Sequence, residues 1–284
     1  MAQEVTLSAS MRANLVSLQN TEVLLNRTQE RLATGKKVNS ALDNPLNFFA
    51  ASAHMQRAND LTARKDGMGE AIQAIKAANN GIEGIKALLE SARGLVEAAR
   101  SESGDRSTIE SQFNTVMAQI KKLATDAGYK GTNFLVGGSN ASASGTATTL
   151  DVLFNEDGSN KLTLTGFDGR VSKLGAYGSR LATGAGTNFS QVSVLNNAAA
   201  AITSAISKLT SEASKLASNL AIINARLDFT NQMVNTLKEG ADKLTLADTN
   251  EEGANMLALQ TRQQLGVTSL SLASQAAQSV LRLF

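Results

Sequence analysis

The chain has 284 residues, of which 42% are hydrophobic and only 4% aromatic, so its apolar contacts depend on aliphatic side chains. Its net charge of +2 is too small to favour a nucleic acid or an anionic membrane as a partner. Cysteine is absent, which excludes disulfides and thiolate metal sites, and the single proline, Pro45, permits long uninterrupted helices.

The first predicted element is an amphipathic helix from about Leu7 to Leu32. Its central apolar residues recur every seven positions, as in a coiled-coil seam: Met11, Leu18, Leu25 and Leu32. Further apolar residues are expected to widen this stripe: Leu7, Leu15, Val16 and Val23. Gly35 is expected to end the helix, because glycine readily adopts the left-handed conformation found at helix C-termini.

Residues 35–46 are rich in polar residues and contain the only proline, so they predict a connector to a second helix. We expect Ser40 or Asp43 to cap that helix, which extends from about Leu46 to Ala99. Apolar residues spaced alternately by four and three then predict a shorter third helix, from about Ile109 to Ala127.

Between Gly128 and Ser190 the composition shifts to Gly, Ser, Thr and Asn. Alternating apolar residues over 150–154 and 162–164, joined by the turn-forming run 155–160, predict a β-hairpin. The low-complexity run 139–149 is interpreted as an exposed loop, and an unmodified surface is its simplest interpretation. Its hydroxyl side chains are also candidate O-glycosylation acceptors: Ser139, Ser142, Ser144, Thr146 and Thr148.

The strongest helical pattern lies in the C-terminal half, where four-three spacing continues from Ile202 to Leu244. At about 1.5 Å per residue, this helix would be roughly 60 Å long. A polar break at 248–250 precedes a last helix that reaches Phe284, and favourable interaction with the helix dipole explains its acidic start, Glu251–Glu252. Small residues on this helix are expected to allow close helix approach: Gly266, Ala273 and Ala277.

The sequence contains no recognisable catalytic pattern. The sole histidine, His54, has no Cys or second His with which to form a metal cluster, and it is interpreted as a helix residue. Phosphate-binding and dinucleotide-binding glycine motifs and the nucleophile elbow are absent from the sequence. We therefore expect no enzymatic activity, no cofactor and no metal.

The apolar stripes allow two interpretations. They form either the internal core of a monomeric helical bundle or, on the two end helices, surfaces that need partners in other subunits. The middle helices can cover one another, but a lone pair of end helices would be marginally stable by itself. Periodicity alone leaves both interpretations open.

Three segments carry a family resemblance. They are residues 29–44 (QERLATGKKVNSALDN), residues 129–135 (YKGTNFL) and residues 259–284, which contain QQLGVTSL and end in SVLRLF. In this order they resemble the N-terminal signature, the turn after the third helix and the C-terminal helix of the bacterial flagellins. The resemblance covers about the first 135 and the last 95 residues, and the middle has no match.

Together with the periodicity, the resemblance implies a mainly α fold. The expected form is a long, coiled-coil-like helical rod with paired N- and C-terminal helices and a small middle insertion that contains a β-hairpin. The implied domains are a filament-core helical domain (1–34 and 251–284), connectors (35–46 and 244–250), a helical rod domain (47–136 and 187–243) and an exposed loop and hairpin region (137–186).

The resemblance implies a structural subunit that polymerises into the flagellar filament for swimming motility. Residues of the first helix are expected to pack against residues of the last, within and between subunits: Met11, Leu18, Leu25 and Leu32 against Leu259, Leu270, Val280 and Phe284. The alternatives are a hook–filament junction protein, which shares the terminal helices, and a secreted protein whose middle segment binds a glycan or receptor.

Partners and localisation also follow from the resemblance. Expected partners are further copies of the chain, other flagellins, a flagellar export chaperone, the filament cap and hook–filament junction proteins, but neither nucleic acid nor membrane. The N-terminus lacks the basic and apolar segments of a cleavable signal, and no apolar run is long enough to span a membrane. The resemblance implies secretion through the flagellar type III channel, without a cleaved signal, into the filament.

One departure from the family concerns host recognition. In flagellins detected by the Toll-like receptor for flagellin, the second helix carries a segment of the type LQRVREL, and the corresponding stretch is 89–95. Ser91 stands where a receptor-contacting Arg is expected, and Gln112 stands near an expected Glu. Because loss of a charge-assisted contact weakens an interface, we expect weak recognition by that receptor.

Overall fold

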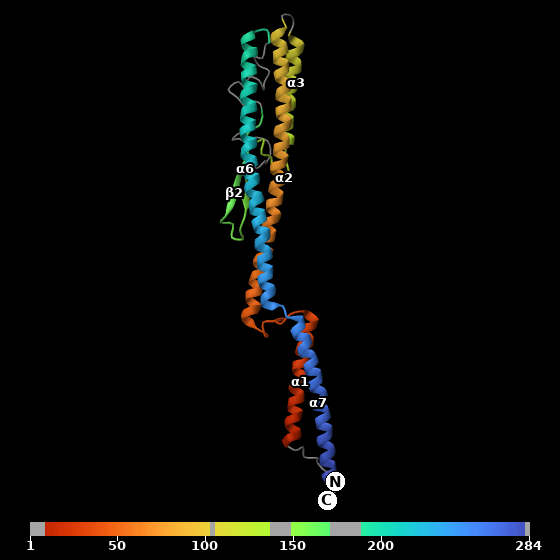
Figure 1. Ribbon diagram of the computed structural model, residues 1–284. Coiled ribbons are helices and arrows are strands. Elements are labelled where there is room, and N and C mark those ends of the chain that lie inside the picture. Colours follow the sequence, from red (N-terminus) through yellow and green to blue (C-terminus); the bar gives the residue numbers. More distant parts are fainter. Residues whose placement is uncertain (1–8, 103–105, 137–148, 171–188, 282–284) are drawn as a thin grey trace. The chain divides into compact units, whose positions relative to one another are not determined.

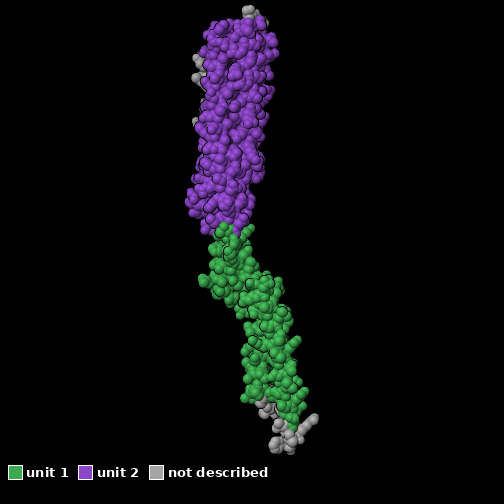
Figure 2. Space-filling model, in the orientation of Figure 1, with its two compact units in different colours: residues 1–56, 236–284 green, residues 57–235 purple. Residues whose placement is uncertain are grey.

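The computed structural model describes residues 9–102, 106–136, 149–170 and 189–281, without the side chains of residues 277, 280 and 281 (Figure 1). The elements of this part of the chain are α1 (Ala9–Thr34), α2 (Pro45–Ser101), α3 (Ser107–Asp126), β1 (Thr149–Leu153), β2 (Lys161–Thr165), α6 (Val192–Thr245) and α7 (Thr249–Leu281). They form two compact units, residues 1–56 with 236–284 and residues 57–235 (Figure 2). The expected mainly α class with a small hairpin is confirmed.

In the first unit, α1 and α7 lie side by side, and the two connectors next to them pair with each other (Figure 1). Lys36 and Leu246 form an antiparallel bridge. Gly35 ends α1 with a φ of 68°, as predicted, and its carbonyl accepts a hydrogen bond from the Ala247 N–H at 3.0 Å. The left-handed glycine therefore both stops the helix and starts the pairing of the connectors.

The start of α2 corrects the expected cap. Asn44 holds the cap position, and its Oδ1 accepts a hydrogen bond from the Asn47 N–H at 3.1 Å. Asp43 instead accepts hydrogen bonds from the N–H groups of Ser40 and Asn39, at 2.9 and 3.0 Å. These backbone hydrogen bonds lower the pKa of Asp43, so its carboxylate stabilises the connector loop rather than the helix.

The second unit has one continuous core between α2, α3 and α6, which run beside each other in Figure 1. Four-three spacing turns an apolar side chain toward this core every three or four residues. The largest fully buried side chains are Phe113, Phe134, Phe189, Met68, Ile75, Ile82, Ile85, Leu89, Ile120, Leu135 and Leu164. Gly81 allows close packing on α2, because a Cβ there would lie only 2.5 Å from the Ala127 Cβ.

The predicted hairpin is present, with Val152 opposite Leu162 in an antiparallel register. Val152 and Leu164 are buried and pack into the core of the second unit. On the exposed side, the ammonium of Lys161 lies 2.7 Å from Asp151 and, with a hydrogen bond from Thr163, lowers the pKa of Asp151. The hairpin is thus anchored by the apolar side chains of one face.

Candidate functional site

A seam between α1 and α7 brings together most of the residues expected in the terminal helix pair. On α1, Met11 and Leu25 are buried, and Leu18 and Leu32 are half-buried. The facing row on α7 is half-buried: Met256, Leu259, Gln263, Gly266, Leu270 and Ala273. A Cβ added at Gly266 would lie 3.1 Å from Leu18 Cδ2, so this glycine allows the close approach expected of small residues.

On the side of α1 that faces α7, polar residues alternate with the apolar residues of the seam, which was not expected from the sequence. Asn14, Thr21 and Thr28 follow the apolar residues at four-three spacing, and the two threonines are buried. The Thr21 hydroxyl donates a hydrogen bond to the Ser17 carbonyl at 2.8 Å, and Asn14 Nδ2 donates to Ser269 Oγ at 3.5 Å. The seam is therefore only half apolar, so burial within it stabilises the pair modestly.

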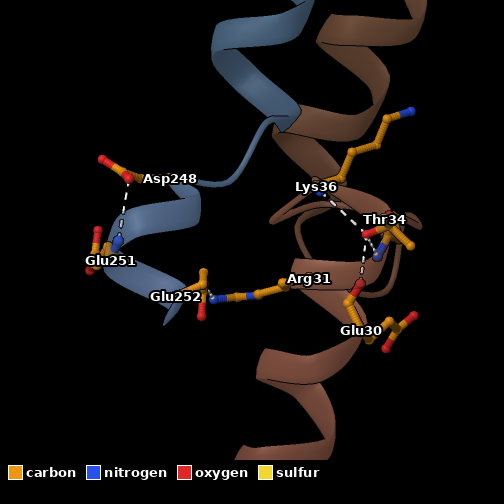
Figure 3. Close-up of polar contacts among 8 residues, drawn as sticks. Glu30, Arg31, Thr34, Lys36, Asp248, Glu251 and Glu252 are labelled. Carbon is orange, nitrogen blue, oxygen red and sulfur yellow. Dashed lines mark hydrogen bonds and ion pairs between the residues drawn. The ribbon is translucent and has the colours of Figure 1, made fainter. Parts of the chain in front are cut away.

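An ion pair closes the connector end of the seam. Arg31 Nη1 lies 2.7 Å from Glu252 Oε1, and the two side chains are 24% and 10% exposed (Figure 3). Glu252 therefore has a specific partner on another helix, and the helix dipole alone does not explain it. Asp248 caps α7, because its Oδ1 accepts a hydrogen bond from the Asn250 N–H at 2.9 Å.

Replacing Arg31 by alanine is expected to destabilise the terminal helix pair by about 2 kcal/mol. The substitution leaves the nearly buried Glu252 carboxylate without its cation. Loss of one partner from a fully buried pair costs about 3–5 kcal/mol, and the partial exposure of Arg31 reduces this figure. Amide hydrogen exchange in α1 and α7 of the full-length chain measures the change. Arg12→Ala, on the exposed side of α1, is the control, and equal effects of the two substitutions would contradict the prediction.

Both terminal helices also carry large apolar side chains on their outer surfaces. Leu15, Val16 and Val23 were expected to widen the seam, but they are 37%, 54% and 66% exposed because their positions turn them away from α7. Leu24 is exposed as well. The exposed apolar residues of α7 are Leu257, Leu265, Val267 and Leu272. Extended apolar surface of this kind is typical of an interaction site.

Several expected residues lie outside the described part of the chain. They are Leu7, Phe284, the side chains of Ala277 and Val280, and the candidate glycosylation acceptors of the run 139–148. Among the described residues, no cluster of three or more His, Asp or Glu side chains could hold a metal ion. No described helix combines the length and apolar character that crossing a membrane requires.

Comparison with known families identifies the chain. Residues 5–140 match the bacterial flagellin N-terminal helical region, and residues 199–284 match the bacterial flagellin C-terminal helical region. The chain belongs to the bacterial flagellins. This flagellin is 30% identical over 276 residues to flagellins FljO and FljM of Caulobacter vibrioides, with 95% of each chain covered.

Two further relatives of this flagellin differ in how closely they match. A flagellin of Brucella melitensis is 27% identical over 292 residues, with 100% of this chain and 99% of the relative covered. The crystal structure of a Bacillus cereus flagellin superposes with a TM-score of 0.48 at 16% identity, covering 58% of this chain and 88% of that one. The full-length sequence relatives support a structural subunit of the flagellar filament, an extracellular assembly of many copies. The family is structural rather than enzymatic.

Proposed function

We propose that the α1–α7 pair carries the contacts that join this flagellin to its neighbours in the filament. The observation that supports the proposal is the large apolar surface that both helices leave exposed outside their own seam. Complete burial of one such side chain is worth about 1.5–3 kcal/mol, and a filament repeats each contact in every subunit. Many moderate contacts therefore suffice for a stable polymer.

The proposal includes a domain assignment. Residues 1–34 and 251–284 form the filament-core domain, residues 47–136 and 187–243 form the rod domain, and residues 137–186 lie on the outer surface. The first compact unit extends further, to Gln56 and from Thr236, because it includes the paired connectors and the adjoining helix ends. The five hydroxyl residues of the run 139–148 remain candidate glycosylation acceptors within the outer segment, to be tested by intact mass spectrometry of native protein.

Seeded polymerisation tests the proposed function and separates it from the junction alternative. Purified chain is added to short filament fragments, and their lengths are followed by electron microscopy. A filament subunit elongates the fragments for as long as monomer remains. Growth that stops after a short terminal layer would instead identify a hook–filament junction protein, and no growth at all would refute assembly by this chain.

We also propose the partners that a filament subunit requires. They are a flagellar export chaperone, the filament cap, the hook–filament junction proteins and co-assembling flagellins, with export through the type III channel and without cleavage of a signal. Support comes from membership of the flagellin family. N-terminal sequencing of the protein from isolated filaments tests the export route, because a cleaved signal would remove the first residues of the chain.

Weak activation of the Toll-like receptor for flagellin is a further proposal. Ser91 on α2 and Gln112 on α3 are both exposed. The surface available to a receptor therefore lacks the positive charge expected at position 91 and the negative charge expected near position 112. The neighbouring Arg93 is held by Glu90 at 2.7 Å. In a reporter-cell assay, wild-type monomer is expected to signal poorly and Ser91→Arg to signal about tenfold better, which corresponds to about 1.4 kcal/mol. Strong signalling by the wild type would contradict the proposal.

A further inference from the structure

A groove of about 340 Å³ lies along one side of the α1–α7 pair, and its lining is basic. Its charged residues are Arg27, Arg31, Arg262 and Glu252. Three positive charges and one negative charge leave a surplus of two. Leu24 and Ala258 add apolar surface beside these charges, so an anion that enters the groove loses part of its water.

The surplus charge belongs to Arg27 and Arg262. Arg31 is neutralised by Glu252, but Arg27 and Arg262 are exposed and take part in no ion pair among the described residues. Arg27 adds only slightly to the lowered pKa of Asp43, which is due mainly to backbone hydrogen bonds. Two guanidinium groups on facing helices can therefore bind a further carboxylate, with charge-assisted hydrogen bonds from both sides.

The opposite side of α1 carries the complementary charge. Glu22 precedes Arg31 by nine residues, which is two and a half helical turns and places the two side chains about 180° apart around the helix. Glu22 is exposed and takes part in no ion pair among the described residues. Leu15 lies two turns before Glu22 on the same side and is also exposed. One side of the pair is therefore basic, and the other presents a carboxylate next to an apolar side chain.

We propose that Glu22 of one copy binds in the Arg27–Arg262 groove of a second copy. This inference rests on the proposed assembly through the terminal helices. The two patches are different and complementary, so the contact is heterologous, and repetition of a non-closing heterologous contact produces an open helical filament. A contact between identical patches would instead close on itself as a dimer. The charge pattern of the pair thus matches the kind of symmetry that a filament needs.

A charge-swap series in the full-length chain tests the contact. The variants are Arg27→Glu with Arg262→Glu, Glu22→Arg, and the combination of all three. Arg12→Glu with Lys238→Glu is the matched control, because it reverses two exposed charges of the same unit that lie outside the groove. The critical concentration for polymerisation is measured by sedimentation at the lowest ionic strength at which the wild type assembles, because salt screens exposed charges. Circular dichroism confirms that each variant is folded.

The groove variant and Glu22→Arg are each expected to raise the critical concentration about tenfold or more, because like charges then meet at the contact. The combined variant restores opposite charges and is expected to return to within about threefold of the wild type. The inference is overturned if the groove variant assembles like the wild type, if the control is equally impaired, or if the combined variant is not rescued. Failure of the wild type itself to assemble would refute the proposed function instead.

Discussion

A chain that ends at Asn250 is expected to remain a folded monomer and to form no filaments. The truncation removes residues 251–284 and with them nearly all of α7, so the α1 seam and the exposed apolar row of α7 are both lost. The second compact unit keeps its own continuous core between α2, α3 and α6 and is expected to stay folded. This is the largest effect that we expect on assembly, because every subunit contact that involves α7 disappears at once.

Electron microscopy after addition of wild-type filament fragments measures the effect, and circular dichroism reports the helix that remains. Point variants distinguish the effect of removing α7 from the effect of changing only its exposed apolar surface. Leu265→Asp with Leu272→Asp places charge on the exposed apolar row, whereas Gln264→Asp with Ser271→Asp places the same charge on neighbouring exposed polar positions. The first pair should block elongation and the second should permit it. Filaments grown from the truncated chain would refute the assignment of α7 to assembly.

The long helices could be predicted from the sequence because their pattern is local. Four-three spacing from Ile202 to Leu244 is visible in neighbouring residues, and α6 extends over Val192–Thr245. The hairpin is local in the same sense, since alternating residues flank a turn-forming run of six. The cap of α2 also depends on neighbouring residues alone, but three polar side chains before Pro45 could cap the helix: Ser40, Asp43 and Asn44. Proline favours the first helical position, which makes Asn44 the cap.

Only the apolar residues of the seam could be predicted from the sequence, because the position of the partner helix α7 determines which other residues of α1 are buried. Thr21 and Thr28 are polar residues whose burial requires α7 to lie against them. Leu15 and Val23 are apolar residues of the same helix that α7 leaves exposed. Apolar residues occur on several sides of α1, and periodicity does not show which side faces the partner. The ambiguity itself has a physical meaning, because a helix with several apolar sides can contact several neighbours.

The Arg31–Glu252 pair shows why charged contacts were harder to predict. The two residues are 221 positions apart in the chain, and no local pattern connects them. Glu252 also has a local explanation, since acidic residues in the first turn stabilise a helix through its dipole. A correct local explanation therefore concealed a second role. The same holds for Arg27 and Arg262, whose common groove exists only once α1 and α7 are paired.

Phe113→Ala is expected to lower the free energy of unfolding of the second unit by about 3–5 kcal/mol. Phe113 is fully buried, and its ring centroid lies 5.2 Å from that of Phe189, so the substitution removes a large side chain and leaves a cavity between α3 and the segment that precedes α6. The chain has only nine phenylalanines and no tryptophan, so few large side chains remain to fill the space. Small aliphatic neighbours on long helices cannot collapse into it without moving the whole bundle.

Phe229→Ala is the matched control, because Phe229 lies on α6 in the same unit but is 53% exposed. It is expected to cost less than about 1 kcal/mol, since much of its ring already contacts water. Urea unfolding followed by circular dichroism compares the two variants at the same protein concentration, under conditions in which the chain is monomeric. Similar losses in both would show that the core of the second unit does not depend on Phe113. A large loss only in Phe113→Ala would locate the stability of the second unit in the α2–α3–α6 core, independently of the terminal helices that we propose to assemble the filament.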